Sequence, residues 1–244
     1  MAEPRTPYAF LMNGRGRYRR WHIWLAWVAA FPILLWVVSG LVMVARPIEE
    51  VRGEGLLREP ATIRLDGPPA PPLVAGVQLT ALSLEQRAAG PRWVIKLPDG
   101  KTRLADPRSG LLLPPLSAND ARQEVEARYA GEAKVQSVAR TSADDPPIDL
   151  RRSIAAWQVT MDDGTHFYVD SASGQIVATR TRWWRFYDLM WGLHIMDPQT
   201  REDTHNPFVI LLGIVALAMS VLGSILLPKA LKKKRNGKKP SLDS

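Results

Sequence analysis

The side chains of this sequence best suited to bind a cofactor or to carry out chemistry are its four histidines. Three of them lie at the ends of long apolar stretches. His22 lies one turn inside the first stretch, and His194 and His205 flank the start of the second. Neutral imidazole is the usual axial ligand of b-type haem, and an ionisable residue in a membrane segment is a functional candidate by default. We therefore predict His22, His194 and His205 as cofactor-binding residues for haem b. The fourth histidine, His166, falls in the middle of a strand pattern and is expected to be exposed.

A purely structural interpretation of these histidines stays open. His22 stands among tryptophans that favour the membrane interface, and His205 precedes the Asn206-Pro207 start of a helix. Distance also limits which histidines share one haem, because His22 and His205 lie at opposite ends of spans about 30 Å long. A cytoplasmic site needs His22 from two chains or a partner protein, whereas an external site could use His194 with His205, or a symmetric pair. Haem binding therefore predicts a homodimer or a membrane complex.

The segment 182–194 is the densest aromatic part of the chain. A helix here would place Trp183, Tyr187, Met190 and His194 on one face. Because Trp and Tyr prefer the level of the lipid headgroups, one interpretation is an interfacial helix that re-enters the bilayer. The other is the wall of a cofactor site.

Two stretches without charged residues, 21–45 and 204–228, are each long enough to cross a hydrocarbon core of about 30 Å as a helix. Clusters of Lys and Arg lie on their outer flanks. The positive-inside rule therefore places the basic tails 1–20 and 229–244 in the cytoplasm and the intervening domain outside it. The lipid bilayer is the first predicted partner.

The net charge of +8 does not indicate a nucleic-acid-binding protein. The two tails carry +4 and +6, and the residues between them carry −2, so the excess positive charge serves topology and contact with anionic headgroups. The absence of cysteine excludes disulfides, thiolate metal sites, cysteine nucleophiles and covalent c-type haem attachment. The chain also lacks a phosphate-binding glycine loop and the common hydrolase and zinc-protease motifs.

The external part contains an internal repeat at a spacing of 64 residues. The stretch 93–110 aligns with 157–174, and six positions are identical at this one offset. In each copy apolar residues alternate with polar ones as in a half-buried strand, and Asp-Gly then supplies a tight hairpin turn. The Asp and Ser-Gly that follow predict a second turn rather than a catalytic carboxylate.

Other patterns complete the expected domain. Residues 117–129 predict a capped amphipathic helix, and 135–140 predict a strand. A short helix is expected at 82–89 in the first copy. The Pro-rich segment 46–72 predicts an extended tether. The predicted fold class is an α+β domain, with helix plus antiparallel β units in tandem, held between two transmembrane α-helices.

The pattern of helix, strand and W-x-V-x-x-x-D-G hairpin ending in V-D-x-x-S-G-x-I resembles the PepSY domain. It is carried by residues 117–128 and 157–177, with a degenerate copy at 93–113. Together with Arg20-Trp-His22, Ser39-Gly40, Gly192-Leu193-His194 and Val221-Leu222-Gly223, it resembles the PepSY-associated transmembrane proteins. The predicted organisation is therefore a tandem PepSY-like periplasmic domain at 73–181 and an aromatic interfacial segment with its loop at 182–203, between the spans.

The resemblance implies a bacterial inner-membrane protein linked to iron and siderophore uptake. Larger relatives with four spans resemble haem-bearing ferric-siderophore reductases, whereas this chain has two, which argues against autonomous transmembrane electron transfer. We therefore expect a haem-binding or haem-partnered component of iron acquisition that assists electron transfer, as an accessory part of a ferric-chelate reductase system. The alternative is a cofactor-free periplasmic module that binds or inhibits another envelope protein, such as a protease or transporter.

Overall fold

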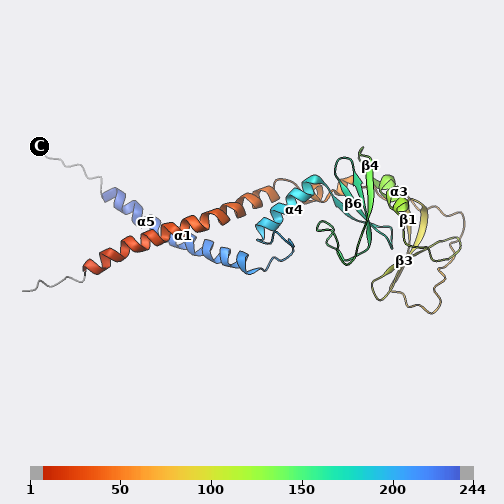
Figure 1. Cartoon of the computed structure of the whole chain (residues 1–244), viewed down its shortest axis with the longest axis horizontal. Coiled ribbons are helices and arrows are strands. Elements are labelled where there is room, and N and C mark those ends of the chain that lie inside the picture. Colours follow the sequence, from red (N-terminus) through yellow and green to blue (C-terminus); the bar gives the residue numbers. More distant parts are fainter. Residues whose placement is uncertain (1–7, 237–244) are drawn as a thin grey trace, which may run out of the picture. The chain divides into compact units, whose positions relative to one another are not determined.

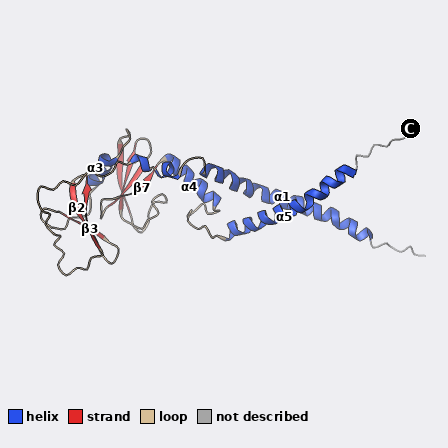
Figure 2. Ribbon diagram, turned by 180° about the vertical axis from the view of Figure 1, so that it is seen from behind, coloured by secondary structure: helices blue, strands red, loops and turns tan. Residues whose placement is uncertain are grey.

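The computed structural model describes residues 8–236, with side chains described from residue 23 to residue 224 except Leu25 and Leu222. The chain forms two compact units. One comprises the residues up to Ala45 together with those from Asp188 onward, and the other comprises Arg46–Tyr187. The first unit is helical, and the seven strands found within residues 8–236 all belong to the second (Figure 2).

The helical unit is built on two long helices, α1 (Tyr8–Met43) and α5 (Pro207–Asn236), which contact each other (Figure 1). Within α1, Ala26–Met43 is long and apolar enough to cross a membrane, and its side chains are largely exposed. The apolar part of α5 that is described, Pro207–Val221, is shorter. The first predicted span is therefore supported, and the second, 204–228, stays a prediction.

The ends of the chain were predicted to be the basic cytoplasmic tails 1–20 and 229–244. Residues 1–7 and 237–244 lie outside the described part, and so do the side chains of the remaining tail residues. Their side of the membrane also stays a prediction.

The larger sheet has the strand order β4-β5-β6-β7, an antiparallel meander of β4 (Val135–Thr141), β5 (Ala156–Met161), β6 (His166–Asp170) and β7 (Ile176–Arg180). Helix α3 (Ala118–Arg128) packs on one face of it. Val159 and Met161 on β5 are fully buried under α3, with Phe167 beside them on β6. The predicted α+β class with antiparallel strands is confirmed.

Helix α3 begins with the predicted cap. The Ser117 hydroxyl accepts a hydrogen bond from the Asp120 amide, and the Asp120 carboxylate accepts one from the Ser117 amide. This reciprocal pair satisfies amides that have no partner within the helix itself. The buried face of α3 carries Ala121 and Val125, as the helical spacing predicts.

The smaller sheet has the order β1-β2-β3, formed by β1 (Ala81–Arg87), β2 (Gly90–Lys96) and β3 (Thr102–Ala105). The helix predicted at 82–89 is wrong. This segment alternates Leu82 and Leu84 with Ser83 and Glu85, a period-two pattern, and it pairs with β2 along its whole length. The first copy of the repeat therefore has no counterpart of α3.

The repeated turns adopt the predicted conformations. Gly100 and Gly164 follow the first strand of each hairpin with φ values of 79° and 80°, where a side chain would be strained. The following Asp106 and Asp170 accept hydrogen bonds from amides of their own turns. These carboxylates are structural, as the sequence indicated.

The segment 46–72 is more structured than the predicted tether. It contains α2 (Ile48–Arg52) and a short 3-10 helix at Glu54–Leu56, and Val51 on α2 is buried. Its Pro-rich end is held by hydrogen bonds, because the Trp93 indole donates to the Ala70 carbonyl at 2.8 Å.

Candidate functional site

The candidate haem ligand His194 is the last residue of helix α4 (Arg182–His194), and its ring packs on α1. The imidazole stacks on the Trp36 ring, with centroids 5.1 Å apart and planes 12° from parallel. Its Nδ1 lies 3.1 Å from both the Trp36 carbonyl oxygen and the Ser39 hydroxyl oxygen. The structure thus brings together His194 and the Ser39-Gly40 pair, which the sequence had identified only as separate motifs.

The hydrogen-bond partners of His194 favour one tautomer. A backbone carbonyl only accepts hydrogen bonds, so the contact with Trp36 is a hydrogen bond when Nδ1 carries the proton. The hydroxyl of Ser39, a fully buried residue, donates to the same carbonyl at 2.9 Å. In the neutral ring this leaves the lone pair on Nε2, which is the protonation state of a histidine that coordinates iron.

Gly40 lets the histidine approach α1 closely. A Cβ atom added at this position would lie 3.2 Å from Cε1 of His194, closer than side chains ordinarily pack. A glycine inside an α-helix costs about 1 kcal/mol relative to alanine. At this position the small size of glycine allows the imidazole of His194 to lie close to the backbone of α1.

The connection that follows α4 is held by two polar side chains. The buried Asp188 carboxylate pairs with the Arg201 guanidinium at 2.6 Å. Asp197 accepts hydrogen bonds from the Thr200 hydroxyl and from the amides of Thr200, Glu202 and Asp203. These bonds, the Thr200 hydroxyl first, hold the pKa of the Asp197 carboxyl well below its usual range.

The other two predicted ligands are not brought to His194. His205 is exposed, and Nδ1 of its ring lies 3.2 Å from the Thr204 hydroxyl. His22 belongs to α1, but its side chain lies outside the described part. It precedes Ser39 by 17 residues, which is about 25 Å along a helix, so His22 and His194 of one chain do not share one haem. Within the described residues no three His, Cys, Asp or Glu side chains are grouped for a metal ion.

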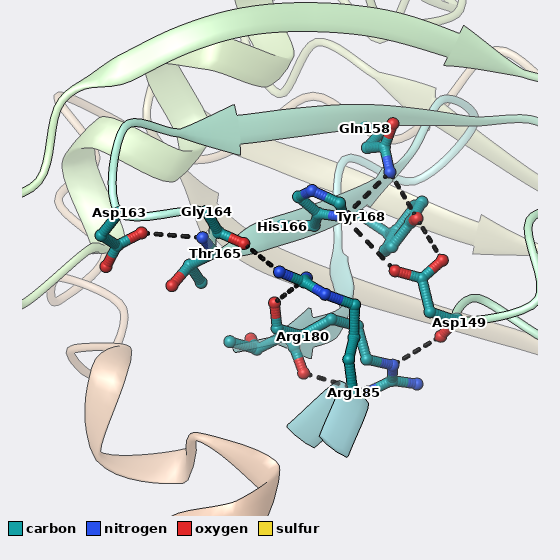
Figure 3. Close-up of polar contacts among 10 residues, drawn as sticks. Asp149, Gln158, Asp163, Gly164, Thr165, His166, Tyr168, Arg180 and Arg185 are labelled. Carbon is teal, nitrogen blue, oxygen red and sulfur yellow. Dashed lines mark hydrogen bonds and ion pairs between the residues drawn. The ribbon is translucent and has the colours of Figure 1, made fainter. Parts of the chain in front are cut away.

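A second polar cluster lies on the face of the larger sheet opposite α3 (Figure 3). Tyr168 is fully buried, and its hydroxyl donates to Oδ1 of Asp149 at 2.6 Å and accepts from Nε2 of Gln158 at 2.6 Å. His166 Nδ1 lies 3.1 Å from Nε2 of Gln158 and 3.3 Å from Oδ2 of Asp149. Burial first, and then the Asp149 carboxylate, raise the pKa of the Tyr168 hydroxyl well above its ordinary value.

The prediction that His166 is an exposed strand residue is therefore wrong. Its side chain is only 24% exposed, because the segment 142–155 covers this face of the sheet. The period-two pattern placed His166 and Tyr168 on one face, but nothing local showed that Asp149 would lie against them. An arginine completes the cluster, since Nε of Arg180 donates to the Asp149 carbonyl at 2.5 Å and its guanidinium lies over the Trp184 ring.

A groove of about 570 Å³ lies within the second unit and is lined by both copies of the repeat. The first copy contributes Leu104 and Leu113, and the second contributes the turn at Asp170. Ile154 and Ala155, from the segment 142–155, form part of its wall.

An apolar helix long enough to span a bilayer and an α+β domain with repeated antiparallel hairpins are the features of a membrane-anchored domain protein. The family model of the PepSY-associated TM region matches residues 19–242, and the chain belongs to this family. No curated protein and no solved structure matches the chain.

Proposed function

We propose that this PepSY-associated membrane protein binds haem b through Nε2 of His194 and assists electron transfer in iron or siderophore acquisition. The observation that supports the proposal is the contact of His194 Nδ1 with the Trp36 carbonyl oxygen. Metal-binding histidines commonly donate their second ring nitrogen to a carbonyl or carboxylate, which orients the ring and raises its basicity. The Trp36 carbonyl takes that role here at 3.1 Å.

The residues around His194 fit such a ligand. The Trp36 carbonyl holds the proton on Nδ1, Ser39 fixes that carbonyl by its own hydrogen bond, and Gly40 leaves room for the ring. Bound haem would supply one-electron transfer, with its potential set by the axial ligands and the surrounding polarity. A second axial ligand would come from another chain or a partner protein, or from His205, and His22 would serve a separate cytoplasmic site. The proposal thus includes a homodimer or a membrane complex.

The absorption spectrum tests this function directly. Protein purified in mild detergent after expression with added haem should show a Soret band that sharpens and shifts on reduction with dithionite. His194→Ala should abolish or change the band, and Ser39→Ala should shift it less, because the Trp36 carbonyl remains. His166→Gln is the matched control, since this histidine belongs to the soluble domain, and it should leave the spectrum unchanged. A colourless wild-type protein would refute haem binding.

The proposed location is the bacterial inner membrane, with both termini cytoplasmic and the domain periplasmic. Because the chain has no cysteine, a single introduced cysteine reports its own side of the membrane. Ser142→Cys, at an exposed position, should react with an impermeant thiol reagent in intact cells. Ser241→Cys, in the predicted cytoplasmic tail and outside the described residues, should react only after permeabilisation. The reverse pattern would contradict the topology.

The second candidate is a cofactor-free module that binds or restrains another envelope protein, such as a protease or transporter. The groove of about 570 Å³ favours it, because apolar side chains of Leu104, Leu113 and Ile154 line a hollow of the size that a peptide side chain or short segment fills. If the purified protein is colourless, cross-linking from an exposed position at the rim of the groove, such as Arg103, should capture a partner. Loss of that cross-link in Leu113→Asp would support this candidate.

A further inference from the structure

The end of helix α4 lies beside the part of α1 that is able to cross a membrane. The His194 ring contacts the Trp36 carbonyl and lies close to the backbone of Gly40. Both of these residues belong to the apolar segment Ala26–Met43, and they precede its last residue by seven and three positions. At 1.5 Å per residue, the imidazole is therefore level with a part of α1 about 5–10 Å inside the Met43 end of that segment.

The beginning of α4 has a contact typical of the headgroup level. Arg46 is the first charged residue after the uncharged stretch 21–45, and its guanidinium lies 4.6 Å from the centre of the Trp183 ring. Tryptophan is enriched at the membrane–water interface, and an arginine near the end of a span extends its charge toward the same level. The contact therefore indicates the headgroup level for the first turn of α4.

One face of α4 is apolar and exposed. Phe186 is 42% exposed and Leu189, three residues later on the same face, is 39% exposed. Leu193 continues this face by one further turn and is half-buried, whereas the exposed Arg182 precedes Phe186 by one turn. The charged side chain is thus at the beginning of the face, and the apolar side chains follow toward the end of the helix that carries His194.

Polar groups in the second half of α4 and in the connection to α5 have partners within the chain. The buried Asp188 carboxylate pairs with the Arg201 guanidinium at 2.6 Å. The Trp191 indole donates to the Arg201 carbonyl at 3.0 Å, and the Asn206 side chain donates to the Ile195 carbonyl at 2.6 Å. The apolar part of a bilayer offers no water, so polar groups at that depth need partners in the protein. At these positions the chain meets that requirement.

We propose that α4 is a re-entrant helix whose second half lies in the membrane leaflet at the Met43 end of α1, where Phe186, Leu189 and Leu193 face lipid acyl chains. The lipid bilayer is the occupant of this face because the exposed apolar surface of α1 lies at the same level. Leu41, in the part of α1 that the imidazole contacts, is 63% exposed. Apolar side chains of both helices at this level are therefore stabilised by contact with lipid.

This position places His194 below the surface of the membrane. A ligand of its Nε2 atom would approach through lipid, which favours an amphiphilic molecule over a hydrophilic one. Helix α4 takes this position with or without haem, because the contacts that place it are all made by the protein itself.

Site-directed spin labelling of the full chain tests the depth of α4, in vesicles of phosphatidylethanolamine and phosphatidylglycerol. Because the chain has no cysteine, a nitroxide can be attached to the single cysteine of Phe186→Cys, Leu189→Cys or Leu193→Cys. Molecular oxygen concentrates in hydrocarbon and a nickel chelate stays in water, so the ratio of their collision rates with the nitroxide rises with depth. Leu41→Cys is the lipid reference at the same level of α1, and Ser142→Cys, at an exposed position of the domain, is the aqueous reference.

The ratio should increase from position 186 to position 193, and at Leu189→Cys and Leu193→Cys it should exceed that of Ser142→Cys several-fold and approach that of Leu41→Cys. Ratios equal to that of Ser142→Cys would place α4 in water and overturn the proposal. Low collision rates with both reagents would overturn it as well, because a second copy or a partner protein would then cover the face. Thermal unfolding like that of the unlabelled protein shows that a variant is folded, and three positions on one face keep the test decisive if one of them is unstable. The measurement needs no haem, so its result is separate from that of the absorption spectrum.

Discussion

Removing the hydroxyl of Tyr168 is the sharpest test of the polar cluster on the larger sheet. In Tyr168→Phe the ring stays in its pocket, while Asp149 loses a hydrogen bond of 2.6 Å and Gln158 loses another of 2.6 Å. A hydrogen bond to a charged group contributes about 1.5–3 kcal/mol. Gln158 keeps its contact with His166, and the Asp149 side chain is 12% exposed, so water replaces part of the loss. We expect a loss of about 2 kcal/mol, toward the lower end of that range.

That loss is measurable as a shift in thermal unfolding. For a domain of this size, about 2 kcal/mol corresponds to a decrease in Tm of roughly 4–8 °C. Near-UV circular dichroism of the full chain follows the transition. Tyr187→Phe is the matched control, because the Tyr187 hydroxyl makes no hydrogen bond within the described residues, and its Tm should stay within about 1 °C of wild type. A Tyr168→Phe protein as stable as wild type would refute the argument.

The stability difference between wild type and Tyr168→Phe should also depend on pH at alkaline values. The pKa of Tyr168 is raised in the folded protein, so its stabilising contribution is fully present below the pKa of an unfolded tyrosine, about 10, and is lost as the pH rises above it. The stability difference between wild type and Tyr168→Phe should therefore be constant from pH 7 to 9 and shrink above pH 10. A difference that grows above pH 10 would contradict this assignment.

Three further perturbations test the local structure. Ser117→Ala should cost about 1 kcal/mol by removing the cap of α3, seen as faster exchange of the Asp120 amide. Gly164→Ala should cost about 1–2 kcal/mol in thermal unfolding because φ is +80°, whereas Gly67→Ala, with open space around it, should be neutral. Asp197→Asn should speed exchange of the Glu202 and Asp203 amides. In wild type the same loosening should appear only as the pH falls below about 4, since the folded pKa of Asp197 is lowered.

Local patterns predicted most of the domain because its elements are determined by near neighbours. The hairpin turns need glycine at positive φ, and α3 needs Ser117 and Asp120 three residues apart, so both are visible in sequence. The strand at Ala81–Arg87 was missed although Leu82 and Leu84 alternate with polar residues, because a helix was expected before the hairpin of the first copy, as in the second.

The candidate sites were less predictable because their partners are distant in sequence. Nδ1 of His194 bonds to a carbonyl 158 residues away, and a backbone carbonyl leaves no residue-type signal at all. His166 depends on Asp149 in an irregular segment. The sequence showed which side chains are chemically reactive, whereas the geometry showed that Nδ1 of His194 lies against the Trp36 carbonyl and the Ser39 hydroxyl.

The repeat also explains why the first copy has no helix. In the second copy the Leu116 amide donates to the Ser171 carbonyl, and the Leu116 carbonyl accepts from the Trp157 indole at 2.8 Å. In the first copy Ala70 makes the same two bonds, to the Pro107 carbonyl and from the Trp93 indole. Pro107 and Ser171 differ by the repeat spacing of 64, so Ala70 is the structural equivalent of Leu116.

The two copies diverge immediately after these equivalent positions. After Leu116 the chain continues with the capping residue Ser117 and enters α3, whereas after Ala70 it continues with Pro71 and Pro72. A residue before proline avoids the helical region, and the two prolines supply no capping side chain. The Pro-rich segment therefore corresponds to the start of α3 in the second copy, and its two prolines prevent a helix from forming there. It stays extended against the smaller sheet, where the Leu73 amide donates to the Gly110 carbonyl at 2.8 Å.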